Sequence, residues 1–300
     1  MKQAFIKLHI SIVLAGFTGI FGKIIMLNEG LLVCYRMLIT ALVMLAILLL
    51  RTHAHTSFPN LLRRGKTGGR LLGVGCLLAL HWVFFFGSIK SSNVSIGVIC
   101  FSLTGFFTAF LEPLMNKRKI SFKELSFSLV TLLGILFIFH FDMRYRTGIL
   151  LGIVSSLFAA LFTITNKQVA TGCPSGVMLL YEMTGGFLLL VLLMPFYLYF
   201  FPVATILPDK MDWIYLLLFS VFCTVLLYLL QIDVLKSISA FTVNLSYNLE
   251  PVYSILIAML FLGEAKELNF SFYIGLGLIV FSVFLQTWSV WKSKKRVSYL

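Results

Sequence analysis

Ten apolar runs of about 20 residues follow one another along the 300-residue chain, separated by short polar turns. A helix of that length spans a bilayer, because it rises about 1.5 Å per residue and the hydrocarbon core is about 30 Å thick. Only 12% of the residues are charged, against about a quarter in soluble proteins. The sequence predicts an all-α integral membrane protein with ten transmembrane helices, at residues 8–27, 31–50, 71–89, 94–115, 125–141, 148–170, 177–200, 213–235, 239–262 and 270–291.

The 24 lysines and arginines lie mainly at the ends of these runs. With the N-terminus inside, 17 of them fall on the inner side and 5 in the outer loops. Inner loops of membrane proteins carry such an excess, so we expect a multi-pass protein with both termini in the cytoplasm. The net charge of +13 then faces anionic membrane lipids, and no nucleic-acid partner is expected.

The chain contains a weak internal repeat with an offset of 146 residues. Residues 35–37 (YRM) match residues 181–183 (YEM), and residues 90–105 match residues 236–251 at polar, glycine and proline positions. We therefore expect two five-helix halves, residues 1–141 and residues 142–300, the second with the basic tail. An odd number of spans in each half makes the two copies face opposite ways, and inverted repeats of this kind build transporters with a site at the bilayer midplane.

Two motifs lead to a family resemblance. Arg36 lies early in the second run, YRMLITALVMLAILLLR, and the ninth run ends EPVYSILIAMLFLGE, with Pro251 inside it and GE at residues 263–264. In the number, order and spacing of these features, the chain resembles the drug/metabolite transporter superfamily, in particular its EamA-type exporters, over residues 10–288. The resemblance implies a transporter in a bacterial inner membrane. The first half departs from the pattern, because it has KR at residues 117–118 in place of the GE ending.

Several polar and aromatic side chains interrupt the runs near their centres. Counting 1.5 Å per residue from the start of each run places His81, Thr104 and Glu250 near the midplane. We expect a wet, substrate-binding cavity at this depth, lined by His81, Trp82, Thr104, Tyr228, Tyr247, Asn248 and Glu250. A histidine that is merely bonded to a neighbouring carbonyl, and packing roles for Trp82 and Tyr228, are the structural alternatives.

The charged residues within the runs are the candidates for gating or coupling. An ionised carboxylate at the membrane centre costs about 2.5–3.5 kcal/mol, so Glu250 is expected to bind a substrate ammonium or to carry a coupling proton. Pro251 beside it kinks the helix. Arg36 and Glu182 each lie about five residues inside helices that start on opposite sides, and we expect them to line the outer and inner vestibules, with local pairing as the alternative.

These observations favour a secondary transporter that moves small organic solutes, most simply an exporter of amino acids or related metabolites. The sequence has no nucleotide-binding motif, so a solute or ion gradient, with proton coupling at Glu250 or Glu182, is the expected energy source, and passive, facilitated transport is the alternative. No cofactor or metal is expected, because the isolated His53 and His55 have no acidic residues near them. The alternatives are an intramembrane enzyme acting on lipid or lipid-linked substrates, for which His81 lacks an obvious serine partner, and a membrane scaffold.

Overall fold

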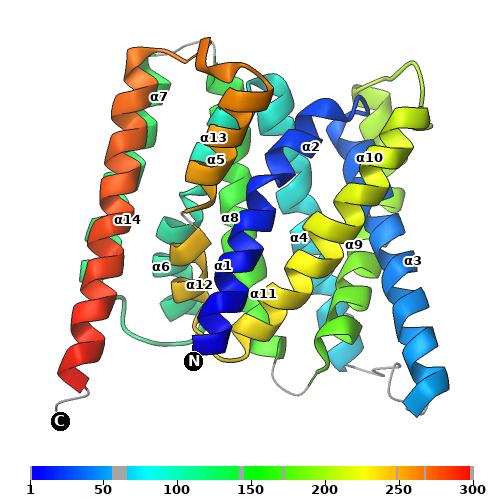
Figure 1. Cartoon of the computed structure of the whole chain (residues 1–300), viewed down its shortest axis with the longest axis horizontal. Coiled ribbons are helices and arrows are strands. Elements are labelled where there is room, and N and C mark those ends of the chain that lie inside the picture. Colours follow the sequence, from blue (N-terminus) through cyan, green and yellow to red (C-terminus); the bar gives the residue numbers. More distant parts are fainter. Residues whose placement is uncertain are drawn as a thin grey trace.

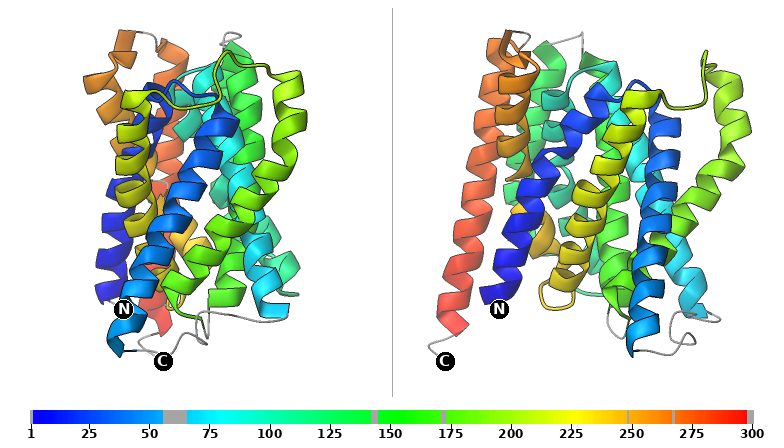
Figure 2. Two further views of the ribbon diagram at one scale, coloured as in Figure 1. Left: turned by 90° about the vertical axis from the view of Figure 1, so that its right-hand side faces the viewer. Right: turned by 45° about the vertical axis from the view of Figure 1, so that its right-hand side comes forward.

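The computed structural model describes residues 2–55, 66–141, 145–170, 173–247, 249–266 and 268–297. Within these ranges the regular elements are all helices, which run up and down between the two ends of the molecule, and α1 begins at the same end at which α14 finishes (Figures 1 and 2). The elements are α1 (Lys2–Gly16), α2 (Thr18–Ile24), α3 (Glu29–His55), α4 (Lys66–Ser91), α5 (Val94–Phe101), α6 (Thr104–Met115), α7 (Phe122–Phe141), α8 (Arg146–Ala170), α9 (Ser175–Phe200), α10 (Lys210–Ser220), the π-helix η3 (Val221–Leu226), α11 (Leu227–Leu235), α12 (Ala240–Tyr247), α13 (Glu250–Phe261), the 3₁₀-helix η4 (Glu264–Lys266) and α14 (Phe270–Val297).

Seven helical segments in the described ranges are long and apolar enough to cross a membrane, with mean hydropathies of 1.8 to 2.4. They are Gln3–Ile24, Glu29–Leu50, Thr67–Ser91, Val94–Met115, Arg146–Ala170, Ser175–Phe200 and Lys210–Leu235. All seven coincide with predicted spans. Two shorter apolar helices, Glu250–Phe261 and Phe270–Ser282, lie within two more. The chain is a multi-pass, all-helical membrane protein, as its hydrophobic pattern predicts.

Two of the predicted spans, one in each half, are broken at equivalent positions, and the first span also divides, into α1 and α2. Residues 94–115 divide into α5 and α6, and residues 239–262 divide into α12 and α13. Pro251 is the second residue of α13, where its missing N–H is harmless because first-turn amides have no partner within the helix. Each of the four helix ends in the first pair precedes its counterpart in the second pair by 146 residues. The repeat predicted from the sequence is therefore visible in the helix boundaries.

The centre of the bundle is α4, which packs against α8 and α9. Glycines bring α4 and α9 into backbone contact. A Cβ atom on Gly75 would lie 1.9 Å from the carbonyl oxygen of Glu182, and one on Gly185 would lie 2.2 Å from that of Leu72. No larger residue fits such an approach, which is typical of packing between membrane helices. The contact fixes the helix that carries His81 and Trp82.

The last long helix of each half, α7 and α14, pack together at one edge of the bundle (Figure 1). Thr131 donates a hydrogen bond to the Ser282 hydroxyl at 2.9 Å, and a Cβ atom on Gly134 would lie 2.8 Å from the carbonyl oxygen of Gly275. The remaining helices of both halves are thereby left to surround the interior of the bundle.

Candidate functional site

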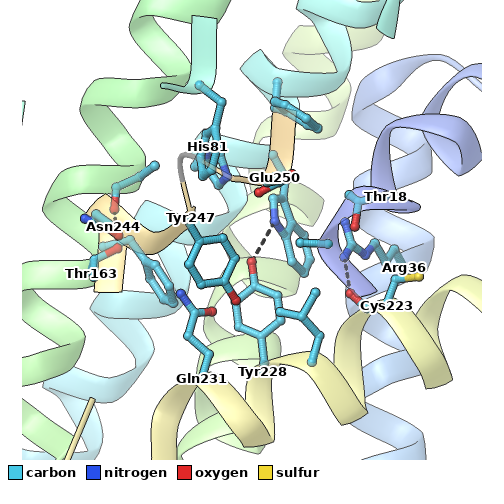
Figure 3. Close-up of a pocket in the computed structure, with 17 residues that line it drawn as sticks. Thr18, Arg36, His81, Thr163, Cys223, Tyr228, Gln231, Asn244, Tyr247 and Glu250 are labelled. Carbon is cyan, nitrogen blue, oxygen red and sulfur yellow. Dashed lines mark hydrogen bonds between the residues drawn. The ribbon is translucent and has the colours of Figure 1, made fainter. Parts of the chain in front are cut away.

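A cavity of about 50 Å³ lies inside the bundle, where the two halves of the chain meet. Seven of its lining residues come from the first half and ten from the second. The volume is enough for a few water molecules, not for a whole organic solute. The lining residues are Ala15, Thr18, Arg36, His81, Trp82, Phe85, Phe101, Ala159, Phe162, Thr163, Cys223, Leu227, Tyr228, Gln231, Asn244, Tyr247 and Glu250 (Figure 3).

Arg36 reaches the cavity from α3 and is only 1% exposed. Its guanidinium is held between two aromatic rings, with Cζ 3.6 Å from the centroid of Trp82 and 3.8 Å from that of Phe219. Such stacking stabilises a cation without neutralising it. The position differs from the outer vestibule that we expected from counting residues along the helix, because the side chain lies on the same cavity as Glu250.

The π-helix η3 supplies the polar partners of Arg36. Nε of Arg36 donates to the Thr224 hydroxyl at 2.8 Å. Nη2 donates to the carbonyl oxygen of Cys223 at 3.0 Å (Figure 3). A π-helix disturbs the regular i−4 hydrogen bonding, so it can leave a carbonyl available to a side chain, and such turns are frequent at functional sites. Nη1 of Arg36 is buried without a hydrogen-bond partner.

Trp82 and Tyr228 meet at the cavity. The Trp82 indole N–H donates to the Tyr228 hydroxyl at 3.1 Å, and the rings pack edge to face with their centroids 5.5 Å apart (Figure 3). Trp82 lies on α4 and Tyr228 on α11, and both are buried. The pair closes one wall of the cavity and, through Trp82, supports the guanidinium of Arg36.

Glu250 is the first residue of α13 and is 4% exposed. Its carboxyl group lines the cavity and has no hydrogen bond to any residue that the structure describes. Tyr247, at the end of α12, also lines the cavity and donates to the Ser11 hydroxyl at 3.0 Å, which ties the broken helix to α1. The helix break thus places an unpartnered carboxyl group in the interior while the backbone beside it is anchored.

His81 both lines the cavity and lies within hydrogen-bonding distance of a carbonyl oxygen, which are the two alternatives that the sequence left open. Its Nδ1 lies 2.8 Å from the Ser155 hydroxyl and 3.1 Å from the Ser155 carbonyl oxygen, while its ring stacks on Phe101 at a cavity wall. Ser155 is a serine partner that we did not find in the sequence. Ser155 is fully buried and does not line the cavity, so the pair offers no accessible nucleophile.

The other predicted residues lie elsewhere. Thr104 is buried at the start of α6, where its hydroxyl donates to the Phe101 carbonyl oxygen at 2.7 Å, and it does not line the cavity. Pro251 does not line it either, and Asn248 lies outside the described residues. Glu182 is fully buried on α9 and accepts a hydrogen bond from Asn166 at 2.9 Å, away from the cavity.

Comparison with known proteins identifies the family. The EamA-like transporter family matches the chain twice, over residues 4–140 and over residues 146–288. The chain belongs to the EamA-like transporter family. Membership confirms the resemblance predicted from the sequence, and it makes the protein a transporter and not an enzyme, so the intramembrane-enzyme alternative is set aside.

Two individual proteins are similar to this EamA-like chain. An uncharacterized transporter of Bacillus subtilis (strain 168), YxxF, is 24% identical over 215 residues, which is 70% of this chain. The match spans 66% of that relative, just under two thirds of its length. A crystal structure of another protein matches 95% of this chain and 97% of its own, with a TM-score of 0.67 and 17% identity. At that identity, the likeness concerns the fold alone.

The structure gives the GE ending of the EamA-like chain a physical role. Gly263 has a φ of +69°, a conformation that favours glycine. Glu264, in η4, accepts hydrogen bonds from the backbone N–H of Val94 at 2.8 Å and of Ser95 at 3.0 Å, and from the Ser95 hydroxyl at 2.6 Å. A carboxylate is favoured at a helix N-terminus, where amides lack partners. Glu264 therefore joins the second half to the start of α5.

The first half has the same turn, but without a side chain that accepts the equivalent hydrogen bonds. Lys117, 146 residues before Gly263, also has a positive φ, of 52°. The position equivalent to Glu264 is occupied by Arg118, a cation that cannot accept hydrogen bonds from backbone amides. At the start of α12, the Ser239 hydroxyl accepts from the Thr242 amide at 3.1 Å, as the equivalent Asn93 side chain accepts from the Ile96 amide at the start of α5. The two halves of the EamA-like fold therefore differ in how their broken helices are held.

Sequence analysis missed several polar residues of the cavity. Thr18, Thr163, Gln231 and Asn244 all line it, and Asn244 donates to the Thr108 hydroxyl at 2.8 Å. Gln231 lies three residues after Tyr228, so it shares a helix face with a residue that was predicted. That spacing was the one available sign of a cavity residue. A threonine or asparagine inside an apolar run gives no such sign, because its side chain can also bond to the backbone of its own helix.

Proposed function

We propose that this protein is a secondary transporter that carries amino acids or related small metabolites out of the cell through the central cavity. The observation that carries the proposal is the presence, on one cavity shared by both halves, of a buried guanidinium and a buried carboxyl group with no ion pair between them. Unpaired charged groups are costly in a protein interior, so they mark a place where a ligand supplies the missing partners.

The proposed topology has ten transmembrane helices in two inverted five-helix repeats, residues 1–141 and 142–300. Its support is the common offset of 146 residues in the broken helices, together with the two family matches. Both termini are assigned to the cytoplasm and the protein to the inner membrane. This assignment rests on the 17 basic residues on the inner side against 5 on the outer. The basic tail would lie against anionic lipids.

The proposed mechanism is alternating access. A cavity of about 50 Å³ is too small for a metabolite, so the surrounding helices must separate for a solute to enter. Broken helices are suitable for this movement, because each half can tilt without bending a continuous helix. Rocking of the two repeats would open the cavity to the cytoplasm and to the outside in turn. Thr104 and Pro251, at the starts of the second half-helices, would then act as hinge residues rather than as ligands.

Proton coupling is part of the proposal. Glu250 is the candidate coupling residue, because its carboxyl group lies on the cavity and has no partner among the described residues. Glu182 is the second candidate, because Oε2 of its fully buried carboxyl group has no hydrogen-bond partner. A proton bound at either position would neutralise a buried charge during the transport cycle.

Flux measurements test this function. The full-length protein in proteoliposomes is given a panel of labelled amino acids and small cationic drugs, with and without a pH gradient, as wild type and as Glu250→Gln. We expect wild-type flux of amino acids that depends on the gradient, and flux without that dependence in Glu250→Gln. Wild-type flux with an unchanged Glu250→Gln variant would reject Glu250 as the coupling residue, and no flux for any solute would reject the function.

A further inference from the structure

The guanidinium of Arg36 has a free hydrogen-bonding edge. Nε and Nη2 are bonded to Thr224 and Cys223, but Nη1 has no partner although the side chain is 1% exposed. Arg36 also forms no ion pair with any carboxylate in the described ranges. A buried donor without an acceptor is costly, and a buried cation without an anion is more so. The missing partner of Arg36 is therefore an anionic oxygen.

The rings around Arg36 favour a carboxylate in that place. Stacking between Trp82 and Phe219 fixes the guanidinium plane, which leaves only its edge for hydrogen bonding. A planar guanidinium with a fixed plane matches a planar carboxylate better than a lysine ammonium does.

Glu250 is the complementary group on the same cavity. It enters from α13 and Arg36 from α3, and both are among the residues drawn around the cavity in Figure 3. Its carboxyl group needs a donor, and the described residues supply none. A ligand ammonium provides up to three N–H donors and a positive charge. The cavity therefore offers one subsite for each end of an amino-carboxylate.

The rest of the cavity wall suits an uncharged side chain. Apart from Arg36, His81 and Glu250, the lining residues are uncharged. Some are apolar, such as Phe85, Phe162 and Leu227, and others carry an amide, such as Gln231 and Asn244. A third charge on the solute would find no partner there. The wall therefore favours a solute with zero net charge and an uncharged side chain.

We propose that the cavity binds its solute as a zwitterion, with the carboxylate on the free edge of Arg36 and the ammonium on Glu250. This assignment rests on the proposed transport function and narrows it: α-amino acids with uncharged side chains are carried, and cationic drugs without a carboxylate are not. A solute that lacks one charge leaves Arg36 or Glu250 unpaired, which weakens binding by about tenfold or more.

Competition in proteoliposomes tests the assignment, with labelled leucine as the probe. The competitors are 3-methylbutylamine, which is leucine without its carboxylate, and 4-methylpentanoate, which is leucine without its ammonium. In the wild type, each competitor should be at least about tenfold weaker than unlabelled leucine. In Arg36→Gln the amine should compete as well as leucine does, and in Glu250→Gln the acid should. Lys210→Gln, which removes an exposed cation away from the cavity, should leave the wild-type order unchanged.

The wild-type comparison needs no variant, so a variant that fails to fold leaves the test intact. Competitors as strong as leucine in the wild type would overturn the assignment, as would transport of other solutes but not of leucine. The same change of preference in both variants would also overturn it, because the assignment predicts opposite changes. Absence of flux for every solute would instead reject the proposed transport function.

Discussion

Trp82 donates its indole N–H to the Tyr228 hydroxyl at 3.1 Å, and the two residues are separated by 146 positions. This is the offset that relates the two halves at the ends of their broken helices. Equivalent residues of two repeats can touch each other only close to the axis that relates the repeats. The cavity beside Trp82 and Tyr228 therefore lies where the two halves meet, and this is where a transporter built from repeats has its site.

The Trp82–Tyr228 bond should couple the two halves energetically. Tyr228→Phe leaves the buried indole N–H without an acceptor, and we expect it to lower the free energy of unfolding by about 1–3 kcal/mol. Trp82→Phe should also destabilise, and the double variant should cost less than the sum of the two by about 1 kcal/mol. The measurement is denaturant unfolding of the four proteins in detergent. Strictly additive losses would show that the two side chains do not interact.

The glycine contact between α4 and α9 predicts that alanine lowers the stability of the protein at one glycine of α4 and raises it at another. A Cβ atom on Gly75 would clash with the backbone of Glu182, so Gly75→Ala should destabilise by about 1–3 kcal/mol. Gly73, on the same helix, has no atom within 4 Å of an added Cβ. Gly73→Ala should therefore stabilise by roughly 0.5–1 kcal/mol through helix propensity. Thermal unfolding of both variants is the check, and equal shifts in one direction would contradict the packing account.

The hydrogen bonds of Glu264 to the start of α5 predict a graded series of losses in the free energy of unfolding. Glu264→Gln turns an amide toward backbone N–H donors and should cost about 1–3 kcal/mol of unfolding free energy. Ser95→Ala removes a single bond and should cost about 1 kcal/mol. Lys266→Gln, an exposed change in the same short helix η4, should stay within about 0.5 kcal/mol of the wild type. A loss in Ser95→Ala larger than that in Glu264→Gln would argue against Glu264 as the cap.

Counting residues along a helix gives the level of a side chain but not its direction around the helix. His81, Trp82, Tyr228, Tyr247 and Glu250 line the cavity as expected, since a rise of 1.5 Å per residue fixes the level along a helix. It does not say which way a side chain points around the helix. The hydroxyl of Thr104 is bonded to the Phe101 carbonyl oxygen at the end of α5 and does not reach the cavity.

Arg36 shows what tertiary contacts add. Its expected place near the outer side came from the position of its Cα atom in a straight helix, whereas the long side chain is held at the cavity by Trp82, Phe219 and the π-helix η3. The sequence of residues 221–226, VFCTVL, does not indicate a π-helix, because it is apolar like the helical segments on either side. The break between α5 and α6 likewise has no proline to mark it, and the repeat was its only signal.

Alternating access through the cavity is the central claim, and side-specific labelling tests it most directly. Thr163, 3% exposed on the cavity wall, is changed to cysteine in a chain whose five native cysteines are replaced by alanine and which retains flux. A membrane-impermeant thiol reagent is then added to right-side-out and to inverted vesicles. We expect Thr163→Cys to react from both sides, and more slowly in both cases when a transported solute is present. Reaction from one side only, or rates that the solute does not change, would contradict the account.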